Sequence, residues 1–91
     1  RLARAGTVIA LPVGRARLYP AFQFDSVRRE VRPIVAEINR LLGALEDPWG
    51  VASWWLTATG FSDDPRSPAE LAVDGGHEED LRAMAGDLLA D

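Results

Sequence analysis

The chain offers few residues that could do chemistry, and His77 is the first of them. It is the only histidine among 91 residues, and there is no cysteine. A single imidazole with no second nitrogen or sulfur ligand at a suitable spacing makes a poor metal site. A Ser-His-Asp triad is defined by geometry, so no spacing in the sequence argues for one. Because His77 follows two glycines, we expect it on the surface at the start of a helix.

Two runs of carboxylates are the next candidates: Asp63-Asp64 and Glu78-Glu79-Asp80. Neither has the spacing of a calcium-binding EF-hand loop. The second run fits the positive end of a helix dipole, which stabilises acidic side chains in the first turn. The glycines of Gly14-Arg15 and Gly75-Gly76 are too sparse to cradle a phosphate, and no Gly-Lys-Ser/Thr follows them. We therefore expect no enzyme activity, no cofactor and no metal.

The charge of the chain is divided unevenly between its two parts. Residues 1–40 hold eight arginines against three acids, a balance of +5, whereas residues 41–91 hold two arginines against eleven acids, a balance of −9. The acidic part could face a basic partner, or it could simply be a solvated surface. The chain has no apolar run of about 18 residues and no signal sequence. With no cysteine to suggest export, we expect a cytoplasmic protein and no membrane partner.

The N-terminal part, about residues 6–24, has the pattern of a β-hairpin. Residues 7–13 are apolar and β-branched, and Gly14-Arg15 fits a two-residue turn in which glycine supplies the positive φ. On the return strand, alternation would place three apolar side chains on one face: Leu18, Phe22 and Phe24. The two prolines of this stretch cannot donate ladder hydrogen bonds, so the hairpin must stay edge-like and lean on helices.

Helical periodicity and capping residues predict helices at about residues 33–44, 48–58, 68–73 and 77–89. The first should begin at Pro33 and carry an apolar stripe of Ile34, Val35, Ile38, Leu41, Leu42 and Leu45. The last should carry a stripe of Leu81, Met84, Ala85, Leu88 and Leu89. We thus expect a single domain over residues 1–91 that is mainly α, with a short N-terminal β-hairpin packed on a compact bundle of about four helices.

Local signals place the ends of the two middle helices. Asp47 should cap the second helix with Pro48 at its first position, and Gly60 should follow its end. Ser67 and Glu70 have the spacing of a capping box at the start of the third helix, which should end before Gly75.

Two tryptophans are adjacent in the second predicted helix. Trp54 and Trp55 lie about 100° apart around the helix axis, so both cannot point inward. Trp55 shares a side with Val51 and is expected in the core. Trp54 either closes the core against the hairpin or serves as an aromatic anchor at an interface.

Arg15 and Arg17 of the predicted hairpin could contact nucleic-acid phosphates. The alternative is that they are scattered surface arginines. No helix-turn-helix is present in these residues, so operator binding would require an upstream part of the protein.

Taken in order, three motifs resemble a known family. They are Tyr19-Pro-Ala-Phe-Gln-Phe-Asp25, Asp47-Pro-Trp-Gly-Val-Ala-Ser-Trp-Trp-Leu56 and Ser67-Pro-Ala-Glu-Leu71. The chain resembles, over about residues 6–89, the toxin-binding domain of Xre/MbcA/ParS-type antitoxins. The resemblance implies an antitoxin of a type II toxin-antitoxin system that binds a RES-type, ADP-ribosyltransferase-like, NAD-degrading toxin and occludes its active site. It also implies a homo-oligomer or a hetero-oligomer with the toxin.

The resemblance makes residues 61–91, a loop and the last helix, the expected cap over the toxin's positive site. The candidate partner-binding residues are Trp54, Asp63, Asp64, Arg66, Glu78, Glu79, Asp80 and Arg82, the two arginines pairing with toxin acids. The alternatives are a DNA-binding autoregulator of its own operon and a plain dimerisation domain of a larger regulator.

Overall fold

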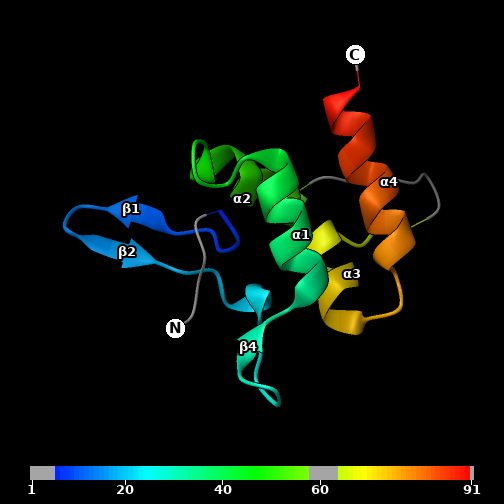
Figure 1. The fold of residues 1–91 in the computed structure, drawn as a ribbon, viewed down its shortest axis with the longest axis horizontal. Helices are drawn as coiled ribbons and strands as arrows, with labels where there is room; N and C mark the ends of the chain where they lie inside the picture. The colour runs from blue at the N-terminus through cyan, green and yellow to red at the C-terminus, as the bar shows by residue number, and fades with distance from the viewer. Residues whose placement is uncertain (1–5, 58–63, 91) are drawn as a thin grey trace.

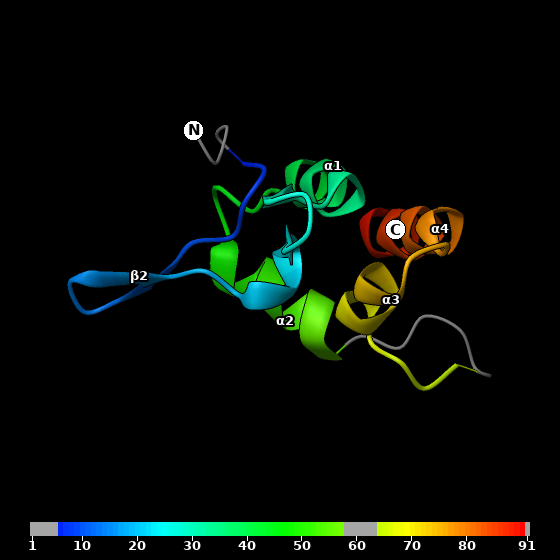
Figure 2. The same cartoon turned by 90° about the horizontal axis from the view of Figure 1, so that it is seen from below.

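The computed structural model describes residues 6–57 and 64–90 and confirms the predicted fold class. Its helices are α1 (Pro33–Leu42), α2 (Pro48–Thr57), α3 (Pro68–Asp74) and α4 (Glu78–Leu89). Its short extended and 3-10 elements are β1 (Leu11–Val13), β2 (Ala16–Leu18), η1 (Ala21–Gln23), β3 (Phe24–Asp25) and β4 (Glu30–Val31). As Figures 1 and 2 show, α1 and α4 lie side by side, α3 lies next to α4, and the β1–β2 hairpin projects from the helical part.

The β1–β2 hairpin has the predicted turn but a shorter return strand. Leu11 pairs with Leu18 across the hairpin, and Gly14 in the turn has a φ of 59°. The strand ends at Leu18, because the chain enters the 3-10 turn η1 after Pro20. The expected face of Leu18, Phe22 and Phe24 is therefore wrong. Leu18 is about half exposed (52%), while Phe22 packs against the core from η1.

A second antiparallel pair, β3–β4, was not predicted from the sequence. Its turn is held by Asp25, whose Oδ1 accepts hydrogen bonds from the amides of Val27 (2.9 Å) and Arg28 (3.1 Å). The Arg28 amide is the main cause of the lowered pKa of Asp25. Arg29 takes the left-handed φ of 60° that closes the turn, and β4 then leads into α1.

The helix α1 begins at Pro33 as predicted and ends at Leu42, after which Gly43 with a φ of 83° forms a left-handed C-cap. Its apolar stripe is buried at Ile34, Val35 and Ile38. The predicted stripe is too long, because Leu41 on the last turn is 50% exposed and Leu45 lies beyond the helix and is 62% exposed.

The helices α2 and α3 begin with the predicted caps. The Oδ1 atom of Asp47 accepts a hydrogen bond from the amide of Gly50 at 3.1 Å. The amide of Ser67 donates to Oε1 of Glu70 at 2.8 Å, and the amide of Glu70 donates to Oγ of Ser67 at 3.2 Å, which completes the capping box. The predicted end of the second helix at Ala58–Gly60 lies outside the described residues.

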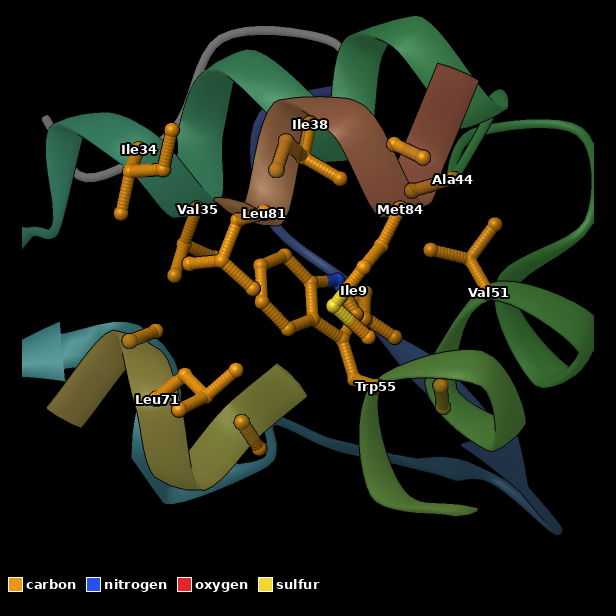
Figure 3. Close-up of a cluster of buried hydrophobic side chains, with 14 residues drawn as sticks. Ile9, Ile34, Val35, Ile38, Ala44, Val51, Trp55, Leu71, Leu81 and Met84 are labelled. Atoms are coloured by element: carbon orange, nitrogen blue, oxygen red, sulfur yellow. The ribbon is translucent and has the colours of Figure 1, made fainter. Parts of the chain in front are cut away.

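Trp55 lies at the centre of the hydrophobic core (Figure 3). Its ring is surrounded by side chains from the N-terminal segment and from all four helices; among them are Ile9, Val35, Val51, Leu71, Leu81 and Met84. Phe22 packs on it with ring centroids 5.2 Å apart. From α4, only Leu81, Met84 and Ala85 enter the core. The expected burial of Leu88 and Leu89 is wrong, because the last turn of α4 leaves both about half exposed.

Two fully buried polar side chains, Gln23 and Asn39, connect the N-terminal segment to the helices. Gln23 accepts from the amide of Ile9 (2.7 Å) and donates to the Ile9 carbonyl (3.2 Å). Asn39 donates to the carbonyl of Thr7 (2.9 Å) and to Oε1 of Gln23 (3.1 Å). Buried polar groups without partners are costly, so this network fixes where the N-terminal segment crosses the bundle.

Candidate functional site

Arg66 is the centre of an ion network between the end of the 64–67 segment and the α3–α4 corner. Its Nε and Nη2 donate to the two carboxylate oxygens of Asp64 at 3.1 and 2.9 Å, and its Nη1 donates to Oδ2 of Asp74 at 3.1 Å. The ring of His77 lies 2.9 Å from the same Asp74 oxygen. His77 is the N-cap residue of α4, which agrees with its expected place at the start of a helix.

The network changes the acidity of its members. The side-chain hydrogen bond from Arg66 lowers the pKa of Asp64 to about 2. His77, followed by Arg66, lowers the pKa of Asp74, and the bond to Asp64 raises the pKa of Arg66. Both aspartates therefore remain ionised at neutral pH, and the guanidinium is held in a fixed position.

Arg66 and Asp74 stand at the rim of a groove of about 740 Å³ between α2 and α3. The groove is lined by Phe22, Leu56, Thr57, Pro65, Arg66, Ser67, Ala69, Glu70, Val73 and Asp74. Its apolar walls include Leu56 and Val73, which are 54% and 50% exposed. A hollow of this volume, apolar with a few fixed polar groups, is of the kind that holds a ligand or a partner's side chain.

The groove brings together only part of the predicted partner-binding set. Asp64 and Arg66 belong to its ion network, whereas Asp63 lies outside the described residues. Sequence reasoning missed the walls at Leu56 and Val73. The sequence did contain a signal for these walls, because Leu56 and Val73 are apolar and directly follow the buried residues Trp55 and Ala72.

The second acidic run stands apart from the groove. Glu78, Glu79 and Asp80 are exposed in the first turn of α4, as the helix dipole favours. Arg82, one turn later, donates from Nε to Glu37 of α1 at 2.7 Å and from Nη2 at 3.0 Å. This pair lowers the pKa of Glu37 and raises that of Arg82. Arg66 and Arg82 thus each form an ion pair with a carboxylate of this protein. To bind an acid of another protein, each would have to give up one of these ion pairs.

Trp54 is intermediate in burial and packs on Trp55, with ring centroids 5.1 Å apart in an edge-to-face arrangement. This position covers the core and leaves part of the ring accessible. Arg15 and Arg17 are both exposed on the β1–β2 hairpin, Arg15 in its turn and Arg17 on β2.

A second hollow of about 330 Å³ lies where α1, α3 and α4 meet the β3–β4 turn. Its charged lining is balanced between three arginines and three acids: Arg28, Arg32, Arg82, Asp25, Glu37 and Glu78. This balance favours neither an anion nor a cation.

Within residues 6–57 and 64–90, no group of three or more histidine, cysteine or acidic side chains is arranged to hold a metal ion. None of the helices in the same residues has the length and apolar character needed to cross a bilayer.

Comparison with known proteins adds no identification: no family model matches the chain, and neither a curated protein nor a solved structure matches it.

Proposed function

We propose that this chain is a binding module without catalytic chemistry of its own, the toxin-binding domain of a type II antitoxin. Its partner would be a RES-type toxin that degrades NAD, and inhibition would come from covering the toxin's active site. A site that grips the pyrophosphate of NAD requires positive charge. An acidic, well-packed surface can occupy such a site without making or breaking a bond.

The observation that carries this proposal is the way charge is presented on the acidic part of the molecule. Both of its arginines make ion pairs with the protein's own carboxylates, Arg66 with Asp64 and Asp74 and Arg82 with Glu37. The exposed acids of α4 therefore outnumber the cations beside them. A basic partner surface would gain attraction and a faster encounter rate from this excess.

Exposed apolar side chains give further support. Large hydrophobic residues at least half exposed include Leu41, Leu45, Trp49, Leu56, Val73, Leu88 and Leu89. Single exposed apolar residues are ordinary, but Leu56 and Val73 line one groove and so form a shared apolar surface that a partner can cover.

The test is to co-express the chain with the reading frame that adjoins its gene. Growth should be rescued, NAD levels should recover, and the two proteins should co-purify. Reversing the charges of Glu78, Glu79 and Asp80 to arginine should weaken the complex and reduce its dependence on salt. The matched control is Glu46→Arg, an exposed acid outside α4. Equal toxicity with and without the wild-type chain would rule out the antitoxin proposal, while unchanged affinity in the triple variant would rule out the acidic cap on α4.

A second candidate function is DNA binding through the projecting hairpin, favoured by the exposure of Arg15 and Arg17. It predicts retardation of an operator fragment with an affinity that falls steeply with salt. Arg15→Gln with Arg17→Gln should abolish the retardation. A plain dimerisation domain would instead sediment as a dimer and leave the neighbour's toxicity unchanged.

A further inference from the structure

We infer that the groove between α2 and α3 is the docking site for a protein segment that presents one apolar side chain flanked by arginine or lysine. The inference rests on the proposed function only in taking the natural partner to be a protein. It differs from that proposal in placing the contact at Leu56, Val73 and Glu70, away from the acidic turn of α4.

The apolar part of the argument comes from the walls of the groove. Leu56 and Val73 face it from different helices, and each is about half exposed. Phe22 completes the lining and packs its ring on the buried indole of Trp55 at 5.2 Å. Phe22 is thus held by the core, and an apolar side chain entering the groove would bury surface of Leu56 and Val73 on both helices.

The charge at the rim selects the flanking residues of the partner. The charged side chains in the described lining are Arg66, Glu70 and Asp74, and Arg66 also pairs with Asp64. The charged lining therefore has a formal charge of −1 at neutral pH, and Asp64, which pairs with Arg66 outside the lining, brings the total to −2. A cation next to the apolar side chain would be attracted to it, while an acidic segment would be repelled.

The carboxylates at this rim are also held in place before any partner arrives. Glu70 is fixed by its capping bond from the amide of Ser67 at 2.8 Å. Asp74 is fixed between Arg66 at 3.1 Å and His77 at 2.9 Å. A partner's arginine or lysine can approach Glu70 and Asp74 while Arg66 stays bound to Asp64. Docking therefore leaves Arg66 with an ion-pair partner inside the protein. Such pre-ordering leaves more of the contact energy for binding.

The first test uses the complex with the protein encoded next to this chain. Leu56→Arg fills the groove and adds a charge that repels a basic partner, and arginine is compatible with a helix. Its matched control is Leu88→Arg, since Leu88 is also helical and is 56% exposed against 54% for Leu56. We expect Leu56→Arg to weaken binding by about tenfold or more and Leu88→Arg to change it by less than about twofold. Thermal unfolding of both variants checks that each is folded.

Glu70→Gln isolates the charge, because the glutamine carbonyl can still accept the capping bond from Ser67. It should weaken binding severalfold and lower the salt dependence. Glu46→Gln, the same change at an exposed glutamate outside the groove and outside the acidic run of α4, should alter neither.

The second test needs no toxin and therefore separates the two proposals. Isotope-labelled protein is titrated with a nine-residue peptide that has a central leucine and arginines on both sides, and with the same peptide carrying glutamates instead. The arginine peptide should shift the methyl signals of Leu56 and Val73, and these shifts should be absent with the glutamate peptide and in Leu56→Arg. If this binding is seen but the neighbouring protein is not bound, the antitoxin proposal fails and the groove stands. The groove proposal is wrong if the neighbouring protein binds Leu56→Arg as tightly as the wild type, or if the arginine peptide leaves both methyl signals in place. Either outcome decides this independently of the antitoxin proposal.

Discussion

The indole Nε1 of Trp55 donates a hydrogen bond of 2.8 Å to Oδ1 of Asn39, and neither residue has any exposed surface. The same amide side chain also donates from Nδ2 to the carbonyl of Thr7 and to Gln23. One asparagine thus joins α2, η1 and the N-terminal segment. Among the described residues, no buried side-chain nitrogen or oxygen is left without a partner.

Replacing this asparagine should be costly. Asn39→Leu removes the acceptor of the Trp55 indole N–H and one donor to the Thr7 carbonyl, and a buried polar group that loses its partner costs about 1–3 kcal/mol. We expect the free energy of unfolding to fall by about 2–4 kcal/mol in urea titrations. Trp55→Phe should cost less in the Asn39→Leu background than in the wild type, because its hydrogen bond is already lost. If the two substitutions instead lower the free energy of unfolding additively, the hydrogen bond between Asn39 and Trp55 contributes no coupling energy.

Gln23 should control the docking of the N-terminal segment. In Gln23→Leu, the Ile9 amide loses its 2.7 Å bond, and the Ile9 carbonyl loses the donor at 3.2 Å. We expect hydrogen exchange at the Ile9 amide to accelerate by about tenfold or more, because a lost buried hydrogen bond is worth about 1–3 kcal/mol. The amide of Gly75, which bonds to Leu71 at the end of α3, is the internal reference and should exchange as in the wild type. Equal acceleration at both sites would indicate global destabilisation instead.

Two glycines should respond in opposite directions to the same substitution. Gly43 has a φ of 83° at the C-cap of α1, so Gly43→Ala should destabilise the protein by about 1 kcal/mol. Gly86 lies inside α4, and a Cβ there would meet no other atom within 4 Å. Gly86→Ala should therefore stabilise by about 0.5–1 kcal/mol. Thermal melts of the two variants beside the wild type measure both signs, and two shifts of the same sign would contradict the account.

The Arg66 network should contribute to the acid limit of stability. The pKa of Asp64 is lowered from 3.8 to about 2 by Arg66, and that of Asp74 is also lowered. Because the folded-state pKa lies below the unfolded one, the stabilisation is fully present above pH 3.8 and is lost as the pH falls towards about 2. Arg66→Met should make the decline of the melting temperature in this window shallower. Arg17→Met, an exposed arginine on the hairpin, should leave the slope unchanged.

The sequence predicted the features whose causes are close together in the chain. The capping box needs only Ser67 and Glu70, and the cap at Asp47 and the turn at Gly14 need only their immediate neighbours. The stripe of α1 identified its buried face but gave its length incorrectly, because periodicity cannot show where neighbouring elements cease to cover a helix. Leu41 and Leu45 are exposed for that reason.

The features missed by the sequence analysis depend on residues far apart. Asn39 follows Ile38 in a helix and gives no local signal of burial, since its partners are Thr7, Gln23 and Trp55. The strands β3 and β4 have two residues each, too few to show alternation. The candidate groove likewise needs α2, α3 and η1 in place before Leu56 and Val73 can be seen as facing walls.

The bond between Asn39 and Trp55 also sets an order of events during synthesis. A nascent chain that has reached residue 50 carries Thr7, Ile9, Gln23 and Asn39 but lacks the indole that completes the cluster. Closure of the interior must wait until the ribosome has released residue 55. Stalled products shorter than this would keep an unfilled centre and present it to chaperones and proteases.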